Sequence, residues 1–278
     1  MVCKTARRRT IVADPFQDVD SAGPEFIKLF ADSMDERQSD PKMEEIVASY
    51  LAALSLSEHS TVIEVGAGAG AVTRRIAAHS SASKVIGFEP SKGFVAEAKD
   101  RGKGYPNLEF LVADGASLPL DSGSIDAVVM HTVLTHVENP KELIVEAFRV
   151  LKPGGTLIVC DADFSKATFS AFPNDPLDIC AKEFVREFVT DPFIVAKMRS
   201  LISDVGFSVA RFGVESRVVN NPEQMLPWVD VTCQQMYERG DIGKELADAL
   251  VAEHHRRAQN GSLYGYQAFA TAIARKPG

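Results

Sequence analysis

Residues 61–72 read TVIEVGAGAGAV, an apolar run that passes directly into three glycines at alternate positions. The β-branched residues at 61–65 predict a buried strand, and the residues near 70–79 predict a helix. Between the two, the glycines let the backbone turn sharply and let a ligand approach where a Cβ would block it. The beginning of the helix offers backbone N–H groups to an anionic part of that ligand. This unit therefore predicts a nucleotide-type binding site.

The alternation of strand and helix continues beyond this unit. Four further strands are expected at KVIGF (84–88), LEFLV (108–112), IDAVVM (125–130) and TLIVC (156–160). Helical stretches lie between them, near 91–101 and 140–151. Continuous apolar strands separated by helices are typical of a parallel sheet covered on both faces. An open α/β sheet is therefore expected.

The residues before the first strand are expected to be mainly helical. Residues 1–24 read as a flexible arm, because proline and glycine breakers interrupt them. Residues 25–34 predict a helix that buries Phe26, Leu29 and Phe30. A second helix begins at Pro41, with Asp40 as its N-cap. Its apolar face consists of Met43, Ile46, Val47, Tyr50, Leu51 and Leu54.

After Asp163 the pattern becomes less regular. The expected elements are a proline-interrupted helical stretch at 164–205, a strand at 207–219, helices at 222–238 and 241–259, and a last strand at 266–276. Asn260-Gly261 is a good end for the second of these helices.

The bulk composition limits the classes of protein that fit. The 278 residues are 45% hydrophobic and 24% charged, so the chain can bury a core without disulfides or a structural metal. The net charge of −8 argues against nucleic acid as a partner. No apolar run approaches the ~20 residues that span a bilayer.

The cysteines and the N-terminus bear on the cellular compartment. Cys3, Cys160, Cys180 and Cys233 show no C-x-x-C spacing, which favours a reducing compartment and a cytoplasmic protein. The basic start MVCKTARRR lacks the apolar segment of a secretory signal. A disordered basic arm and an organelle address both stay open for it.

The glycine loop alone does not identify the class of cofactor. Gly66, Gly68 and Ala71 also satisfy the dinucleotide pattern G-x-G-x-x-A, so a nicotinamide-dependent oxidoreductase is the rival hypothesis. Glu89 ends the second strand, nineteen residues after Gly70, where a carboxylate can accept hydrogen bonds from both ribose hydroxyls. A ribose is common to several nucleotide-type cofactors, so Glu89 does not decide which of them binds. Glu89 can also be read as a solvated acid that caps the next helix.

Three later motifs separate the rivals. Asp114-Gly115 follows the third strand, IDAVVMHTVLTHV (125–137) spans the fourth, and LKPGG (151–155) precedes the fifth. With the glycine loop, this ordered set resembles the class I S-adenosylmethionine-dependent methyltransferases. AFRVLKPGG and the ending IARKP are similar to the small-molecule type related to ubiquinone and menaquinone biosynthesis. Glu64 stands where Asp is usual in that family, and Ala67 where Cys is frequent.

The resemblance implies a fold and a domain organisation. The fold is a Rossmann-like, doubly wound, mostly parallel α/β sheet of about seven strands, with an antiparallel last strand and helical lid segments. Residues 25–278 then form one domain after the arm. Its cofactor half is expected at 40–161, its substrate half at 162–265 and its closing strand at 266–276.

The resemblance also implies a binding site for S-adenosylmethionine. The glycines would flank its methionine part, Glu89 would hold the ribose, Pro90 or Phe88 would lie against the adenine, and Asp114 and Gly115 would meet the adenine edge. The full expected set is Glu64, Gly66, Ala67, Gly68, Gly70, Glu89, Pro90, Asp114, Gly115, Met130 and His131.

Catalytic and substrate-binding residues are expected after the fourth and fifth strands. His131 is the first choice as a base or positioning group and His136 the second, because histidine accepts protons near neutral pH. Asp161 and Asp163 leave the fifth strand on the ligand side of an open α/β sheet. Candidate pocket walls further on are Trp228, Tyr237, Tyr264 and Tyr266. No cluster has metal-ligand spacing, so no metal is expected.

The leading functional hypothesis is a metal-independent methyltransferase that acts on a small organic acceptor as a monomer or homodimer, without nucleic acid. The alternatives are a cyclase-type enzyme that binds the same cofactor and a nicotinamide-dependent oxidoreductase. The acceptor atom stays open among oxygen, nitrogen, carbon and sulfur, since fold analogy does not choose between them.

Overall fold

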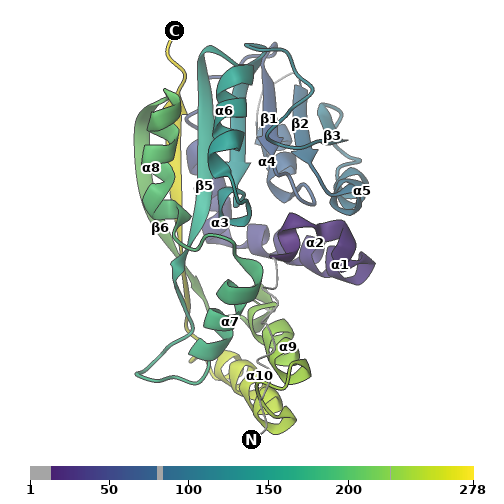
Figure 1. Ribbon diagram of the computed structural model, residues 1–278, viewed down its shortest axis with the longest axis vertical. Coiled ribbons are helices and arrows are strands. Elements are labelled where there is room, and N and C mark those ends of the chain that lie inside the picture. The colour runs from purple at the N-terminus through teal and green to yellow at the C-terminus, as the bar shows by residue number, and fades with distance from the viewer. Residues whose placement is uncertain (1–13, 80–83, 226) are drawn as a thin grey trace, which may run out of the picture.

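The computed structural model describes residues 14–79, 84–225 and 227–278. Its centre is a seven-stranded sheet in the order β3-β2-β1-β4-β5-β7-β6 (Figure 1). The strands are β1 (Thr61–Val65), β2 (Lys84–Glu89), β3 (Leu108–Val112), β4 (Ile125–His131), β5 (Leu151–Thr168), β6 (Ser208–Val219) and β7 (Gly265–Arg275). The first five are parallel, and β7 lies antiparallel between β5 and β6. The expected mostly parallel sheet with an antiparallel last strand is confirmed.

Helices cover both faces of the sheet, as its continuous apolar strands require. One face packs against α3 (Pro41–Leu51), α4 (Ala71–His79) and α5 (Lys92–Arg101), and the other against α6 (Pro140–Val150) and α8 (Ile194–Val205). Strand β4 shows the alternation: Ala127 and Val129 belong to the first core, and Val128 and Met130 to the second. Asp40 caps α3 by accepting a hydrogen bond from the Lys42 amide (2.8 Å), as the sequence predicts.

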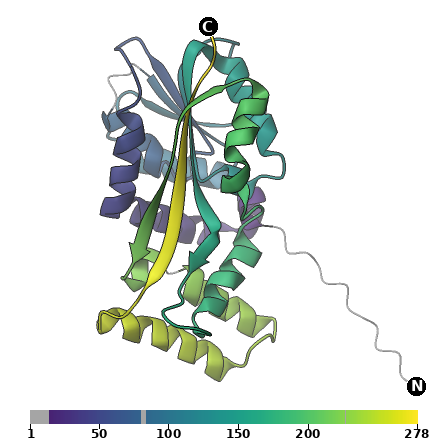
Figure 2. The same cartoon turned by 90° about the vertical axis from the view of Figure 1, so that its left-hand side faces the viewer.

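Three long strands carry a second layer of helices. Figures 1 and 2 show β5, β6 and β7 running past the ends of the other strands toward α7, α9 and α10. These helices are α7 (Asp178–Phe188), α9 (Thr232–Glu238) and α10 (Lys244–Gln259), and the short turns η3 (Pro222–Met225) and η4 (Pro227–Val231) precede α9. We call α7, η4, α9 and α10 the lid. A buried ion pair between Arg257 of α10 and Asp175 (2.6 Å) ties the lid to the segment before α7.

The N-terminal segment is more ordered than the expected arm over 1–24. Residues 1–13 lie outside the described part, but η1 (Pro15–Gln17), α1 (Val19–Ala22) and α2 (Pro24–Ser39) are helical. Asp20 fixes this segment, because its carboxylate accepts hydrogen bonds from the Ser91 hydroxyl (2.7 Å) and the Gly93 amide (3.0 Å) at the start of α5. Those bonds lower the pKa of Asp20. They join residues some seventy positions apart, so local breakers could not reveal them.

Two other expectations differ from the structure. The stretch 164–205 is not helical throughout, because β5 continues to Thr168 and pairs there with Tyr266 of β7. Leu29, expected in the core, is 36% exposed, whereas Phe30 beside it is buried. In both places long-range packing outweighs local pattern.

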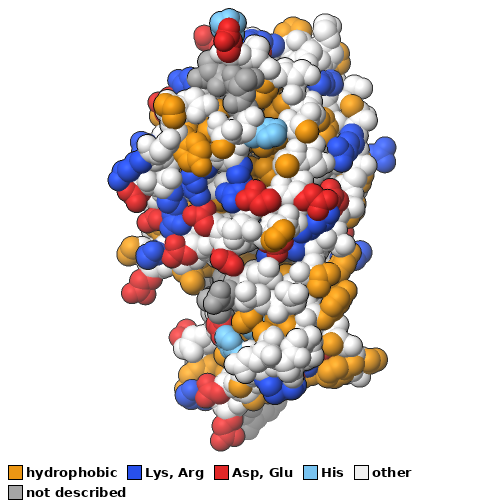
Figure 3. All heavy atoms as spheres, turned by 180° about the vertical axis from the view of Figure 1, so that it is seen from behind, with side chains coloured by type: hydrophobic (Ala, Val, Ile, Leu, Met, Phe, Trp, Pro, Cys, Tyr) orange, Lys and Arg blue, Asp and Glu red, His pale blue; other side chains and the backbone are white. Residues whose placement is uncertain are grey.

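The described surface carries charges of both signs. On the face drawn in Figure 3, basic and acidic side chains are interspersed. In the described residues, no helix is long and apolar enough to cross a membrane.

Candidate active site

A large pocket opens at the carboxyl ends of the parallel strands, the edge at which open α/β sheets bind ligands. Its empty volume is about 1200 Å³, part of which is open to solvent. The cofactor end is lined by Gly66, Gly68, Glu89, Pro90, Asp114 and Gly115, all of which the sequence predicted. The opposite end lies under α2 and the lid. We call it the acceptor chamber, and its walls include Phe30, Arg37, Phe164, Phe184, Arg217 and Trp228.

The glycine loop is shaped by close packing. Gly66 has a φ of +70°, and a Cβ there would come within 2.6 Å of Val133. Gly68 has a φ of +52°, and a Cβ there would meet Met34 of α2 at 2.9 Å. A side chain at either position would therefore both strain the backbone and push neighbours into the pocket.

The amides of this loop already have protein partners. The amides of Gly66 and Ala67 donate to the Phe88 carbonyl (2.8 and 3.0 Å), and that of Gly70 donates to the Ala67 carbonyl (2.8 Å). The Gly68 amide donates to the Glu89 carboxylate (2.9 Å). A pyrophosphate needs such amides for itself. The arrangement thus disfavours a dinucleotide and fits a cofactor that has no phosphate.

Glu89 is positioned to hold a ribose. One carboxylate oxygen accepts from the Gly68 amide (2.9 Å) and the other from the Ser91 amide (3.0 Å), which leaves lone pairs on both oxygens. Burial raises the pKa of Glu89. At the other side of this end, Asp114 accepts from the Ala116 amide (2.9 Å). These residues fit the adenosine part of S-adenosylmethionine.

Several predicted cofactor residues do not line the pocket. Glu64 is buried and accepts a hydrogen bond from the Thr73 hydroxyl (2.5 Å). Gly70 packs against Phe110, where a Cβ would come within 2.5 Å of the ring. The other two predicted residues of this kind, Ala67 and Met130, are core residues. These residues support the loop and do not face a ligand.

The two candidate histidines have opposite surroundings. His131 is buried outside the pocket lining, where its Nδ1 lies 3.0 Å from the Tyr50 hydroxyl. Burial lowers its pKa to about 3, so it stays neutral. His136 lines the pocket, and its Nδ1 lies 2.9 Å from the carboxylate of Asp14. The structure therefore brings His136 to the pocket, and not the first-choice residue.

The predicted substrate residues are also divided. Trp228 lines the pocket. Asp161 does not, because its buried carboxylate accepts hydrogen bonds from the amides of Thr135 (3.2 Å) and Ala162 (2.9 Å), and burial raises its pKa to about 6. Asp163 accepts from the Ser165 hydroxyl (2.5 Å), and Tyr264 is 43% exposed. The remaining candidates, Tyr237 and Tyr266, are likewise absent from the lining.

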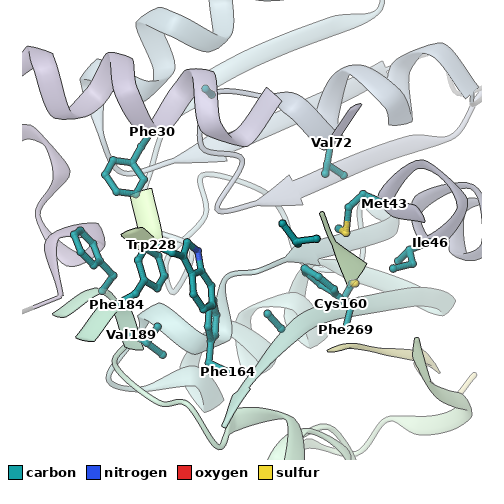
Figure 4. Packing of buried hydrophobic residues seen from close by; sticks show 14 of the residues in the cluster. Phe30, Met43, Ile46, Val72, Cys160, Phe164, Phe184, Val189, Trp228 and Phe269 are labelled. Carbon is teal, nitrogen blue, oxygen red and sulfur yellow. The ribbon is translucent and has the colours of Figure 1, made fainter. Parts of the chain in front are cut away.

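Stacked aromatic rings form one wall of the acceptor chamber (Figure 4). The rings of Phe184 and Trp228 are nearly parallel, with centroids 4.2 Å apart. The ring of Phe164 lies beside this pair, 5.7 Å from Trp228 and 6.3 Å from Phe184. Phe30 reaches the same region from α2. These rings come from α2, β5, α7 and η4, so this wall of the chamber is apolar and forms only when the lid is folded.

Sequence reasoning missed several polar residues of the pocket region, among them Asp14, Arg37, Thr132 and Arg217. Asp14 lies in the expected arm, Arg37 lies between two expected helices, and Arg217 lies in the expected strand at 207–219. Thr132 lines the pocket with a φ of +54°, an uncommon conformation for a β-branched residue. Its hydroxyl accepts a hydrogen bond from Arg37 (3.2 Å). The sequence holds no local signal for these contacts.

Among the described residues, no group of three or more His, Cys, Asp or Glu side chains could hold a metal ion.

Similar proteins of known sequence and structure also indicate a methyltransferase. The profile of the methyltransferase-domain family matches residues 63–159. A demethylmenaquinone methyltransferase of Tropheryma whipplei is 30% identical over 55% of this chain and 69% of that enzyme. An uncharacterized 37.1 kDa protein of a Streptomyces fradiae transposon is 31% identical over 57% of this chain, and the match spans about half of that protein (46%). In fold, the 4+2 cyclase SpnF has a TM-score of 0.61 and 20% identity, covering 96% of this chain and 98% of its own.

The strand order, the glycine loop after β1 and the carboxylate at the end of β2 define a class I S-adenosylmethionine-dependent methyltransferase. Within that class, the chain belongs to the methyltransferase-domain family that includes the demethylmenaquinone methyltransferases. The resemblance inferred from the sequence is confirmed.

Proposed function

We propose that this protein binds S-adenosylmethionine at the cofactor end of the pocket and transfers its methyl group to a small organic acceptor in the aromatic chamber. The observation that carries the proposal is the pocket itself, in which a carboxylate suited to a ribose opens into a chamber with an aromatic wall. The proposed site is built from residues of one chain. The proposed setting is the cytoplasm, where the buried thiols of Cys160, Cys180 and Cys233 stay reduced.

The chamber would align the acceptor and keep water away from it. When bound, S-adenosylmethionine supplies an electrophilic methyl group on a positively charged sulfur, and the electrons of the broken carbon–sulfur bond stay on that sulfur. Trp228 and Phe184 offer flat apolar surfaces to the acceptor. Holding the two reactants together in a dry space supplies most of the rate enhancement that such a transfer needs.

His136 would take the proton that the acceptor loses. Its Nδ1 is hydrogen-bonded to Asp14, which leaves Nε2 as the proton acceptor and stabilises the imidazolium that forms. The Thr190 hydroxyl donates to the same carboxylate oxygen (3.0 Å) and fixes its position. The proton therefore moves from the acceptor to Nε2 of His136.

The experiment that tests this proposal has two separate readouts. Isothermal titration with S-adenosylhomocysteine measures cofactor binding, and incubation with radiolabelled S-adenosylmethionine and a metabolite extract measures transfer. We expect saturable binding and label in a small organic product. Binding of NAD with no response to S-adenosylhomocysteine would contradict the cofactor assignment.

The same assay tests the alternative of a cyclase-type reaction, which the likeness to SpnF raises at the level of fold alone. A cyclase would convert its substrate without forming S-adenosylhomocysteine. We expect S-adenosylhomocysteine to accumulate in proportion to product.

Replacing Glu89 by glutamine is expected to weaken S-adenosylhomocysteine binding about 30-fold, because the amide nitrogen cannot accept a ribose hydroxyl or the Ser91 amide. Glu146→Gln is the matched control. Glu146 is likewise 7% exposed and accepts a backbone amide, that of Leu118 (2.7 Å), but it does not line the pocket. Equal losses in the two variants, measured by titration calorimetry, would rule out a ribose-binding role for Glu89.

A further inference from the structure

Fixed charges in the pocket lining are separated by sign. The acidic residues of the lining, Glu89 and Asp114, both lie at the cofactor end. The guanidinium groups of the described lining residues, Arg37 and Arg217, lie in the acceptor chamber. A bound sulfonium adds a further positive charge between them. Among the described residues, the lining of the acceptor chamber therefore contains guanidinium groups and no carboxylate.

Arg217 is the more deeply buried indication that a ligand atom binds in the chamber. It lies on β6, is 1% exposed, and donates from Nε to the Asp40 carboxylate (2.9 Å). Asp40 is shared, because the Gln224 amide donates to the same oxygen (2.8 Å) and the carboxylate also caps α3. Within the described residues, Nη2 of Arg217 has no hydrogen-bond partner. An unpartnered guanidinium nitrogen at this depth is costly, so a ligand atom is expected there.

Arg37 approaches the same space from α2. One of its terminal nitrogens donates to Thr132 (3.2 Å), and its Nε is buried without a partner in the described part of the chain. Burial and the nearby charge of Arg217 lower the pKa of Arg37 to about 10, so it remains a cation at neutral pH. The negative charge of Asp161 raises the pKa of Arg37. The Asp161 carboxylate, however, accepts hydrogen bonds from backbone amides and does not line the pocket.

We propose that the acceptor is an organic acid with a flat unsaturated body, whose carboxylate is held by Arg217 and Arg37 while its body lies against Trp228 and Phe184. The proposal rests on the proposed function and adds the chemical class of the substrate to it. A planar guanidinium suits a carboxylate because it donates two parallel hydrogen bonds. Gln267, which pairs with Arg217 across β6 and β7, also lines this end of the pocket.

The topology favours the carboxylate of the acceptor, and not that of the cofactor's methionine part, as the ligand of Arg217. The glycine loop follows β1, and β6 is separated from β1 by β4, β5 and β7. Arg217 therefore belongs to the half of the sheet that carries the lid. Arg37 lies between the two halves, so variants of Arg217 distinguish the two sources.

The test uses the full chain saturated with S-adenosylhomocysteine. Benzoic, cinnamic and hydroxycinnamic acids and their primary carboxamides are titrated into the wild type, R217Q, R217K and R211Q. Arg211 is the matched control, since it lies on the same strand but is exposed and contacts Ser49 (3.1 Å). We expect an acid to bind about 30-fold more tightly than its carboxamide in the wild type and R211Q, and about equally in R217Q. R217K, which keeps the cation, should retain part of the preference.

The outcomes separate the two proposals. Acids that bind no better than carboxamides in the wild type, or a preference that survives in R217Q, would overturn the organic-acid proposal and leave the proposed function standing. A loss of S-adenosylhomocysteine affinity in R217Q as large as the loss of acid affinity would assign the guanidinium to the cofactor instead. Failure of the wild type to bind S-adenosylhomocysteine would overturn the proposed function itself. If R217Q does not fold, the acid-to-carboxamide ratios of the wild type and R217K decide the question.

Discussion

Replacement of His136 by asparagine is expected to lower kcat by roughly 10²–10³-fold, because the loss of a positioned proton acceptor removes that part of the rate. The neighbouring Asp14 carboxylate would still have an amide to bind, so the pocket should keep its shape. Cofactor affinity should change little, since Glu89 and the glycine loop are untouched. The measurement is a steady-state rate with the acceptor found in the extract assay, together with the dissociation constant of S-adenosylhomocysteine.

Two companion variants show whether the effect belongs to the proton. Asp14→Asn keeps the histidine but replaces its carboxylate partner by a neutral amide, and it should lower kcat about tenfold. His255→Asn is the control, because His255 also faces a carboxylate, Asp230 at 3.9 Å, but lies outside the pocket lining. A loss in H136N that is constant across pH and accompanied by weaker acceptor binding would mean that His136 only shapes the chamber.

The choice between the histidines shows what local pattern can predict. In β4, Ala127 and Val129 face the core that contains α3, and the two-residue period of a strand puts His131 on the same side. There it meets Tyr50 of α3. The backbone then leaves the strand through Thr132, whose φ is +54°, and the next turn brings His136 to the pocket. The strand period was available from the sequence, whereas the turn at Thr132 was not.

The cofactor end was predictable because its geometry is local. Gly66 follows β1 directly, Gly68 comes two residues later and Glu89 ends β2, so the sheet fixes their places once the strands are recognised. The acceptor chamber depends on contacts between distant segments. Asp14 and His136 are 122 positions apart, and Asp40 and Arg217 are 177 apart. No periodicity or turn signal encodes such pairs.

Glu64 stands where the family usually has aspartate, and its burial makes the free energy of unfolding depend on pH. The carboxyl group is 2% exposed, and within the described part of the chain its side-chain hydrogen bond comes from the Thr73 hydroxyl (2.5 Å). Burial raises its pKa from 4.5 to about 8 in the folded protein. Between these two values the folded chain holds a proton that the unfolded chain has released. The free energy of unfolding therefore falls as pH rises through this window.

Glu64→Gln removes this proton equilibrium while keeping the shape of the protonated side chain. Its free energy of unfolding, relative to that of the wild type, should rise by roughly 4 kcal/mol between pH 5 and pH 9, because each unit of pKa shift corresponds to about 1.4 kcal/mol. Urea denaturation at several pH values measures the difference, in which the titrations of all other groups cancel. At pH 5 the two proteins should be similar in stability, since the buried carboxyl group is then neutral in the folded state. Parallel stability curves for the two proteins across this range would mean that Glu64 ionises freely, either through water that reaches it or through a stronger cationic partner such as Arg74, whose charge already favours the ionised form.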